Sequence, residues 1–516
     1  MAATIMLFRS ASPHHFALFA ACVLIFVASV HFWDLIPDQE RLTVTGTHGD
    51  GRLIHPFGHQ EPLGEAKQCG TAFVHLKDLG LSKNIKYSKR CIRPVFPDDA
   101  DRDIITNVSA QLITNTTIVN LDNVCSTGLD SLPCEPLELP VPKPDPESLG
   151  QYTHLLFGIA TSFQRLRDSK QSFGHWLANS GATLVCMIVD EPKELLSVDF
   201  ADLEAEYAVS GMKLKLVERQ DMRHTPEQSH MMLIRNLLSY SAGIPTQIHW
   251  IGILDDDTFF PSLHALSTEL ARHDHTRSRY LGALTEDSNA LQQGILAAWG
   301  GAGIFLSLAL ANEIEPHLEG CLSDRGGDML IMECIHAHSH ARLTTVEGLW
   351  QMDFMGDTAG IYESGRRTLS MHHWKSWHWL PVQEMAMVTH ICGECFLERF
   401  IFPVPEDESP SGNGEVKSLS RTNGATVLNV GYSINLYSDG LPDLSRIEQT
   451  WDGIDAWKEY EWSVGPLRPR LAKQKKKTWW LKTAFHGSKG ELTQIYLHEG
   501  GEEGKNDEII ELIFAL

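Results

Sequence analysis

Three consecutive aspartates, Asp255, Asp256 and Asp257, are the residues of this sequence with the clearest capacity for chemistry. They follow the apolar, β-prone run Ile248–Leu254 and lie just before Phe259–Phe260. Adjacent carboxylates repel one another and lose hydration when they are buried, so they need compensation. A divalent cation supplies it, and oxygen ligands suit Mg²⁺ or Mn²⁺, ions that also bind phosphate. The alternative is a solvated acidic turn, but the apolar flanks favour a metal and nucleotide site.

A glycine-rich stretch, AWGGAGIFLS at residues 298–307, is a second candidate for ligand contact. Its glycines at positions 300, 301 and 303 allow the backbone to approach a ligand closely or to adopt a positive φ. A tight turn that contacts no ligand explains the same glycines equally well.

A further acid, Asp328, lies between Cys321 and Cys334 together with Asp324. If the two cysteines pair, the loop that carries these acids is held in place. A carboxylate fixed in a cleft is a candidate general base. Asp328 also precedes the apolar run 329–332, which is typical of a helix N-cap, and one residue can fill both roles.

Two groups of histidines are metal-ligand candidates. His372 and His373 follow a strand-like run and are flanked by aromatic residues, so one of them is expected to complete the coordination of an ion held by Asp257. His336, His338 and His340 would bind together only on an extended segment. A helix would separate them, and we interpret them as exposed histidines.

The elements that must position these residues alternate between strand and helix. Buried strands are expected at 155–161, 182–190 and 248–254, and helices at 164–177, 235–240 and 262–273. This alternation predicts an α/β fold with a mixed, mostly parallel sheet and helices on both faces. Ligands of such sheets bind beyond the carboxyl ends of the strands, where Thr161 and the aspartates fall. No GxGxxG or Walker A motif is present, so a Rossmann dehydrogenase or a P-loop NTPase is excluded.

Composition excludes a further class of function. The 516 residues are 43% hydrophobic and 21% charged, which is typical of a globular protein with more than one core. The net charge of −23 argues against a nucleic-acid partner, because there is no basic excess to neutralise phosphates.

The N-terminal region predicts a membrane anchor. Residues 16–33 are almost entirely apolar, with Arg9 before them and Asp34 after them. This length suits a single span, and the charge bias places residues 1–15 in the cytosol and the rest in the lumen. A cleaved signal peptide is the alternative. In the lumen, Asn107 and Asn115 would be glycosylation acceptors.

A lumenal chain also makes its cysteines disulfide candidates, with Cys186 a buried free thiol inside an apolar run. Residues 34–150 are expected to form a stem and a disulfide-rich lead-in, residues 151–400 the catalytic domain, and residues 401–516 a linker followed by a small C-terminal β element. The disulfide candidates are Cys69, Cys91, Cys125, Cys134, Cys321, Cys334, Cys392 and Cys395.

An ordered set of motifs over roughly residues 154–381 resembles the Fringe-like members of glycosyltransferase family 31, in their plant and fungal branch. The motifs are HLLFGIATS, the Arg235 helix, WIGILDDDTFF, YLGALTE, AWGGAGIFLS, the Asp328 segment, GLWQMDFMGD and LSMHHW. The resemblance implies a single-pass type II enzyme of the Golgi or endoplasmic reticulum with a GT-A fold. It further implies a UDP-sugar donor, Mn²⁺ or Mg²⁺, inversion to a β-1,3-type linkage, and a glycan or glycoprotein acceptor.

The resemblance also assigns roles to individual residues. Asp328 corresponds to the catalytic base, and Asp257 would bind the ion with Asp255 and His373 as further ligands. Asp255 or Asp256 would face the ribose. The residues expected to contact the nucleotide or the two substrates are Thr161, Arg165, Arg235, Gly301 and Gly303.

Two other functions compete with this interpretation. A non-catalytic lumenal carbohydrate-binding protein on the same fold would bind sugar without releasing UDP. The intact Asp255–Asp257 triplet, Asp328 and His373 argue against it. A metal hydrolase built on the histidines at 336–340 lacks HExxH or a comparable ligand spacing.

Overall fold

The structure is a computed structural model, and it describes residues 74–122, 134, 136–145, 150–191, 193–196, 198–219, 221–404, 424–452, 461–501 and 506–515. All of them belong to one compact unit, Lys67–Leu516. The anchor predicted at residues 16–33 and the linker at 405–423 lie outside the described residues, as do Cys69 and Cys125. Within the described ranges, no helix has the length and apolarity needed to cross a bilayer.

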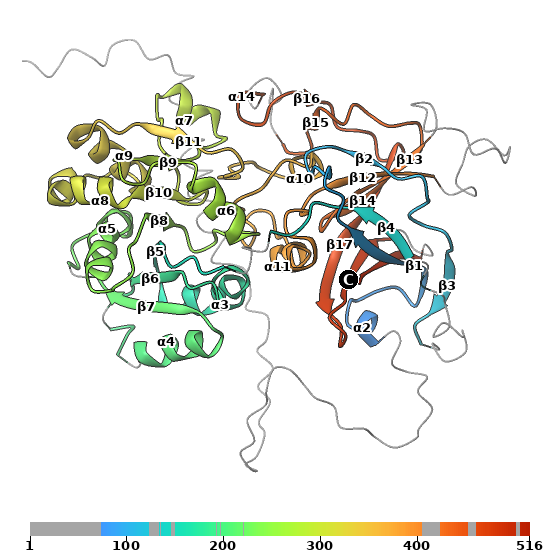
Figure 1. Cartoon of the computed structure of the whole chain (residues 1–516), viewed down its shortest axis with the longest axis horizontal. Helices are drawn as coiled ribbons and strands as arrows, with labels where there is room; N and C mark the ends of the chain where they lie inside the picture. Colours follow the sequence, from blue (N-terminus) through green and yellow to red (C-terminus); the bar gives the residue numbers. More distant parts are fainter. Residues whose placement is uncertain are drawn as a thin grey trace, which may run out of the picture. The chain divides into compact units, whose positions relative to one another are not determined.

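A seven-stranded mixed sheet carries the candidate chemistry (Figure 1), with the strand order β11-β9-β10-β8-β5-β6-β7. Four of its pairings are parallel and two, β8–β10 and β9–β10, are antiparallel, so the mixed, mostly parallel sheet is confirmed. The strands are β5 (Leu155–Thr161), β6 (Thr183–Ile188), β7 (Lys213–Glu218), β8 (Trp250–Leu254), β9 (Tyr280–Gly282), β10 (Ile304–Ser307) and β11 (Leu343–Thr345).

Helices cover both faces of this sheet because its central strands are buried on both sides. One apolar cluster packs alternate residues of β5 and β6 against α3, α4 and α6, and another packs the intervening residues against α5, α8 and α9. The longer helices begin at sequence caps: Ser162 caps α3, and Thr225 with Gln228 forms a capping box on α5. The helices are α3 (Phe163–Leu177), α4 (Phe200–Val209), α5 (Pro226–Ala242), α6 (Leu263–Leu270), α7 (Ser288–Gln292), α8 (Leu308–Ile314), η4 (Glu315–Cys321) and α9 (Gly327–His338).

A second sheet is larger than the small C-terminal β element that the sequence predicts. It has ten strands, and the lead-in region contributes four of them, because β1 pairs in parallel with β19 and β2 pairs with β12. Within the C-terminal region, β13 and β14 pair as an antiparallel hairpin. The strands are β1 (Asn84–Val95), β2 (Thr106–Asn107), β3 (Thr117–Asn120), β4 (Pro136–Pro140), β12 (Arg399–Pro403), β13 (Ala425–Asn429), β14 (Ser433–Tyr437), β17 (Lys476–His486), β18 (Leu492–His498) and β19 (Asp507–Phe514).

Short elements complete the described chain. Strands β15 (Ile447–Glu448) and β16 (Leu467–Arg468) pair with each other. The short helices are α2 (Val74–Lys77), α10 (Ala359–Glu363), α11 (Val382–Ala386), α12 (Thr389–Cys392) and α14 (Glu461–Val464).

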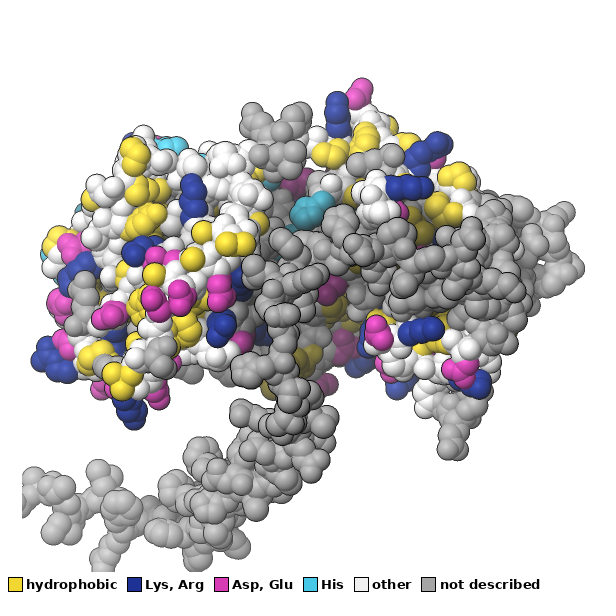
Figure 2. Space-filling model, turned by 90° about the horizontal axis from the view of Figure 1, so that it is seen from below, with side chains coloured by type: hydrophobic (Ala, Val, Ile, Leu, Met, Phe, Trp, Pro, Cys, Tyr) yellow, Lys and Arg dark blue, Asp and Glu magenta, His cyan; other side chains and the backbone are white. Residues whose placement is uncertain are grey.

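Among the described residues, the cysteines predicted to form disulfides are paired, and the cysteine predicted to be free is unpaired. Disulfides join Cys91 to Cys134, Cys321 to Cys334 and Cys392 to Cys395, and Cys186 is a buried free thiol. Figure 2 shows acidic and basic side chains intermingled across the described part of one face, rather than segregated by sign.

Candidate active site

The acid triplet lies at the carboxyl end of β8. Hydrogen bonds of the buried Thr258 link it to the turn at residues 300–303, here called the glycine turn. The Thr258 hydroxyl lies 3.2 Å from Gly300 O and 3.1 Å from Gly301 O, and it accepts a hydrogen bond from the Asp255 N–H at 3.2 Å. The Asp255 N–H also lies 3.2 Å from Gly300 O. The triplet and the turn are therefore held as one backbone unit.

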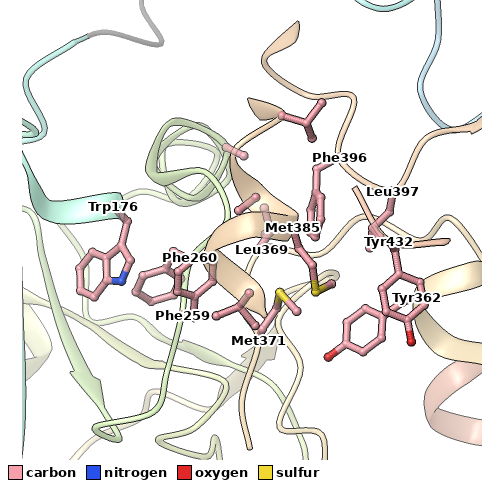
Figure 3. Close-up of a cluster of buried hydrophobic side chains, with 14 of the residues drawn as sticks. Trp176, Phe259, Phe260, Tyr362, Leu369, Met371, Met385, Phe396, Leu397 and Tyr432 are labelled. Atoms are coloured by element: carbon pink, nitrogen blue, oxygen red, sulfur yellow. The ribbon is translucent and has the colours of Figure 1, made fainter. Parts of the chain in front are cut away.

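An isolated two-residue bridge brings the histidine segment to the same place. Phe259 and Met371 exchange backbone hydrogen bonds of 2.9 and 2.8 Å in an antiparallel bridge. Figure 3 shows Phe259, Phe260 and Met371 within a buried cluster of apolar side chains. His372 directly follows Met371 and Asp257 lies two residues before Phe259, so the bridge brings these two side chains together.

The three aspartates have different partners. Asp256 accepts two hydrogen bonds from the Arg165 guanidinium and one from the Thr161 hydroxyl, and Lys375 Nζ lies 3.7 Å away. Burial opposes the charged form of Asp256, but these hydrogen bonds and the Lys375 charge lower its pKa. The chain's own cations thus compensate Asp256. The prediction that a metal ion must compensate all three acids is therefore wrong for Asp256. For Asp255 and Asp257 it stays a prediction.

His372 faces these two remaining acids. Its Nε2 lies 3.0 Å from Asp257 Oδ1 and 3.4 Å from Asp255 Oδ2, while Nδ1 lies 2.8 Å from the carbonyl oxygen of Gln351 and donates to it. Burial disfavours the imidazolium, yet the hydrogen bond to Asp257 and the two carboxylate charges raise the His372 pKa to about 9. A backbone acceptor on Nδ1 is the arrangement that orients a metal-binding histidine through Nε2.

Asp255 lines the pocket, where its side chain is 37% exposed. Desolvation, followed by the negative charge of Asp328, raises its pKa to about 6. For Asp257, burial acts in the same direction, but the hydrogen bond and charge of His372, together with the charges of His373 and Lys375, outweigh it, so the pKa of Asp257 is lowered. An excess of negative charge therefore remains where Asp255 meets the pocket.

The donor atoms suit a divalent ion. One ligand atom from each of Asp257, His372 and His373 lies within 4.8 Å of the others, and carboxylate oxygen with imidazole nitrogen is a set that Mn²⁺ accepts. The metal role of His373 stays a prediction, because its Nε2 lies 3.2 Å from Asp353 Oδ1 and its ring stacks on Trp377 at 3.8 Å. Local sequence does not distinguish between the adjacent histidines, and the geometry adds His372 to the candidate ligands.

Asp328 lies in the first turn of α9, across the glycine turn from the triplet. Its Oδ2 accepts a hydrogen bond of 3.1 Å from Gly300 N, and its Oδ1 lies 3.2 Å from His230 Nε2. The predicted disulfide Cys321–Cys334 ties the preceding loop to this helix. The N-cap interpretation of Asp328 is wrong, because Gly326 is the N-cap residue and Asp328 is a helical residue.

His230 is a site residue that the sequence analysis missed. It is buried on α5, and burial disfavours its charged form, but Asp328 and then Asp255 raise its pKa. A lone histidine inside an amphipathic helix gives no local signal of such a partner, because the Asp328 contact forms only when α5 packs against α9.

The glycines serve packing more than ligand contact. A Cβ on Gly301 would lie 2.2 Å from His372 Nδ1, and one on Gly300 would lie 2.8 Å from Asp255 Oδ1. Gly303 has φ +101°, and a Cβ there would lie 2.8 Å from the Phe305 ring. The expected ligand-facing role of Gly301 and Gly303 is therefore replaced by close packing behind the site. Both residues are buried and neither is among those lining the pocket.

Arg235 does not join the other predicted residues. It lies on α5, where Nε pairs with Glu315 at 2.8 Å and Nη1 with Glu319 at 2.9 Å. Arg235 is absent from the described lining of the pocket that holds the triplet, so its assignment to the nucleotide is a correction. The predicted exposure of the histidines at 336, 338 and 340 is confirmed.

One open pocket of about 710 Å³ collects the rest of the predicted site. Trp299, Gln351, Asp353, Ser376 and Trp377 line it as well, and the sequence analysis assigned no role to any of them. The predicted residues that line it are Thr161, Arg165, Asp255, Asp256, Asp257, Asp328 and His373.

Behind this pocket lies a buried glutamate, Glu286, whose carboxylate accepts a hydrogen bond of 3.1 Å from the Asp353 N–H. Burial, and then the charge of Asp353, raise its pKa from 4.5 to about 8. The folded chain therefore keeps a proton that the unfolded chain releases. This contribution to stability is fully present below pH 4.5 and is lost as the pH rises through about 8.

Glu286→Gln is expected to remove this pH dependence. Relative to wild type, the variant should gain stability as the pH rises from 5 to 9, by on the order of 3 kcal/mol at the upper end. Thermal melting across that range measures it. Glu347→Gln, at an exposed glutamate, is the control and should follow wild type at every pH. A constant offset between Glu286→Gln and wild type would contradict a neutral Glu286.

Comparison with known proteins gives one family match. A family model described as "Protein of unknown function, DUF604" matches residues 291–396, which is less than half of the chain. The matched range contains the glycine turn, Asp328, Asp353 and the His372–His373 pair, whereas the acid triplet precedes it. No curated protein matches the sequence.

Several solved structures show similarity. The chain is 10% identical to the glycosyltransferase GlyE of Streptococcus pneumoniae TIGR4, at TM-score 0.24, over 37% of this chain and 45% of that one. A glycosyltransferase involved in the glycosylation of the major capsid of PBCV-1 is 9% identical, at TM-score 0.24, over 42% and 92%. Mouse xyloside xylosyltransferase 1 is 12% identical, at TM-score 0.23, over 37% and 84%. The match spans less than half of the pneumococcal enzyme, and similarities this low carry no conclusion about activity.

Proposed function

We propose that this chain is a metal-dependent, inverting glycosyltransferase that moves a sugar from a UDP-sugar to a hydroxyl of a glycan or glycoprotein. One observation carries the proposal. Asp255, Asp257 and His372 line a single open pocket at the carboxyl ends of β5 and β8 with Asp328 on its other side. Ligands of open α/β sheets bind at such strand ends. The resemblance to Fringe-like enzymes of the GT-A fold supports the same function, including a β-1,3-type linkage.

Asp257, Asp255 and His372 would hold Mn²⁺ or Mg²⁺, with His373 as a further ligand. When bound, the ion neutralises negative charge on the diphosphate of the donor. Arg165 and Thr161 line the same pocket beside Asp256, where they are placed to contact the nucleotide. Because Arg165 is already fixed by two hydrogen bonds, its charge is held at the pocket wall without further ordering.

Asp328 acts as the base in the proposed reaction. Its carboxylate takes the proton of the acceptor hydroxyl while the acceptor oxygen attacks the anomeric carbon from the face opposite the leaving group. The bond from the anomeric carbon to the diphosphate oxygen breaks, and UDP departs with the electron pair. One carboxylate suffices for this single displacement, whereas a retaining enzyme needs a second as nucleophile. The hydrogen bond from Gly300 N orients Asp328 for this role.

The proposed compartment is the lumen of the Golgi or endoplasmic reticulum, with residues 16–33 as the anchor. Three disulfides among the described cysteines support an oxidising compartment, because such bonds do not persist in the cytosol.

A screen for UDP release tests the proposal. The full-length chain, purified in mild detergent, is incubated with each common UDP-sugar, with glycan acceptors, and with Mn²⁺, Mg²⁺ or EDTA. We expect at least one UDP-sugar to release UDP in the presence of Mn²⁺ and EDTA to stop the release. Failure of every donor under every metal condition would refute the proposed activity.

A further inference from the structure

A second pocket, separate from the one that holds the acid triplet, is lined mainly by aromatic and apolar side chains. Its volume is about 240 Å³, slightly below the roughly 300–1,000 Å³ of most small-molecule sites. A pocket of this size suits one ring rather than a whole nucleotide. Its lining includes Asp357, Trp379, Met385, Tyr432, Trp480 and Leu481.

Two tryptophans of this pocket are unusually exposed. Trp379 is 77% exposed and Trp480 is 39% exposed. Large aromatic surfaces left in water are costly and commonly mark binding sites. Below them, Tyr432 packs edge-on against Trp480 at 5.5 Å and belongs, with Met385, to the buried cluster of Figure 3, which gives the pocket a rigid floor.

The backbone holds Trp379 outward under strain. Its φ is +51°, a left-handed conformation that bulky residues rarely adopt. The preceding loop is fastened, because the N–H groups of Ser376, Trp377 and His378 lie 3.2, 3.0 and 3.0 Å from the carbonyl oxygen of His373. Leu380 N donates to Trp374 O at 2.8 Å. Strain that the surroundings maintain is typical of ligand-binding positions.

This loop connects the two pockets. His373 and Trp377 line the pocket of the acid triplet, and Trp379, two residues later, lines the aromatic pocket. The Trp377 ring stacks on His373 at 3.8 Å with an angle of 8° between the planes. The loop at residues 373–379 therefore contributes side chains to both pockets.

The chemistry of the aromatic pocket suits a sugar. A pyranose presents apolar C–H faces, which pack on the negative face of an indole, and a rim of hydroxyls. Asp357 supplies carboxylate acceptors for such hydroxyls: it is partly exposed and pairs with Arg470 at 2.8 Å. An apolar peptide would desolvate this acid without supplying hydrogen bonds to it.

We propose that this pocket binds a sugar of the acceptor glycan, beyond the ring that carries the reacting hydroxyl. The inference rests on the glycosyltransferase function proposed above. Binding of the remote ring would orient the reacting hydroxyl toward Asp328. The chain would therefore prefer an extended acceptor to the corresponding monosaccharide.

The binding test uses the full-length chain and defined gluco-, galacto-, manno- and xylo-oligosaccharides of two to six residues. Tryptophan fluorescence and saturation-transfer NMR report binding without any turnover. We expect at least one series to bind, and Trp379→Ala and Trp480→Ala each to weaken that binding about tenfold, as loss of one stacking ring does. Trp379→Phe keeps a ring and should recover part of the affinity. Val209→Ala, at a 90% exposed residue of α4, is the control.

The transfer assay separates this inference from the proposed function. The ratio of kcat/KM for the oligosaccharide to that for its monosaccharide should fall about tenfold in Trp379→Ala and stay as in wild type in Val209→Ala. If both tryptophan variants still transfer sugar with an unchanged ratio, the proposed sugar-binding pocket is refuted and the proposed transferase function stands. Glycan binding that depends on Trp379, without transfer to any acceptor, supports the pocket and refutes the transferase. Absence of binding by every oligosaccharide at millimolar concentration also overturns the pocket.

Discussion

Asp257→Ala is expected to abolish metal-dependent release of UDP, with turnover at least about 100-fold below wild type. Loss of a residue that only supports a metal ligand already costs roughly 10–100-fold, and Asp257 is proposed as a ligand itself. Its carboxylate lies 3.0 Å from His372 Nε2, so the substitution also removes the hydrogen bond that helps to raise the His372 pKa. The measurements are UDP release against Mn²⁺ concentration and Mn²⁺ binding by calorimetry.

Two further variants show whether the loss of turnover is specific to Asp257. Asp202→Ala, at an exposed acid of α4, changes the net charge equally and should keep wild-type turnover. Asp256→Asn should mainly lower the melting temperature, because Arg165 and Lys375 lose their buried partner. Retained turnover in Asp257→Ala would refute the metal assignment.

Asp328→Asn is expected to eliminate sugar transfer while UDP and Mn²⁺ still bind. General bases contribute about 10²–10⁴-fold, and transfer should fall by that factor. Asparagine keeps an oxygen that can accept the hydrogen bond from Gly300 N, so the glycine turn should stay in place. Only proton acceptance is lost. Transfer kinetics and calorimetric titration with UDP distinguish the two effects.

Two other results would contradict the assignment of Asp328 as the base. Normal transfer by Asp328→Asn would remove Asp328 as the base. Loss of UDP binding together with transfer would instead assign Asp328 to the architecture of the pocket, through its hydrogen bond to the glycine turn.

The central strands of the seven-stranded sheet could be predicted from local runs of apolar residues. The buried runs at 155–161, 182–190 and 248–254 form adjacent parallel strands, because uninterrupted apolar residues suit a sheet covered on both faces. Strand ends at one edge then bring Thr161 and the aspartates together. The two cysteines on either side of Asp328, Cys321 and Cys334, likewise predicted the disulfide that joins them.

The features that the sequence could not reveal depend on tertiary contacts. Arg235 has the charge expected of a nucleotide contact, yet Glu315 and Glu319 reach it only after η4 packs near α5. The adjacent histidines differ in their partners, because His372 donates to the Gln351 carbonyl oxygen while His373 lies 3.2 Å from Asp353 Oδ1. No local sequence pattern indicates that Lys375, 119 residues further along the chain, offsets the negative charge of Asp256.

The pairing of β1 with β19 has a consequence for biosynthesis. Ser82, just before β1, donates its N–H to Asp507 at the start of β19, across 425 residues. At roughly 5–20 residues per second, β19 leaves the ribosome about 20 to 85 s after β1. Throughout that interval one edge of β1 lacks its partner and can associate with other nascent chains. The yield of folded protein should therefore depend on chaperones that shield this strand during translation. Nonsense mutations that remove β19 should trigger degradation even though the acid triplet is intact.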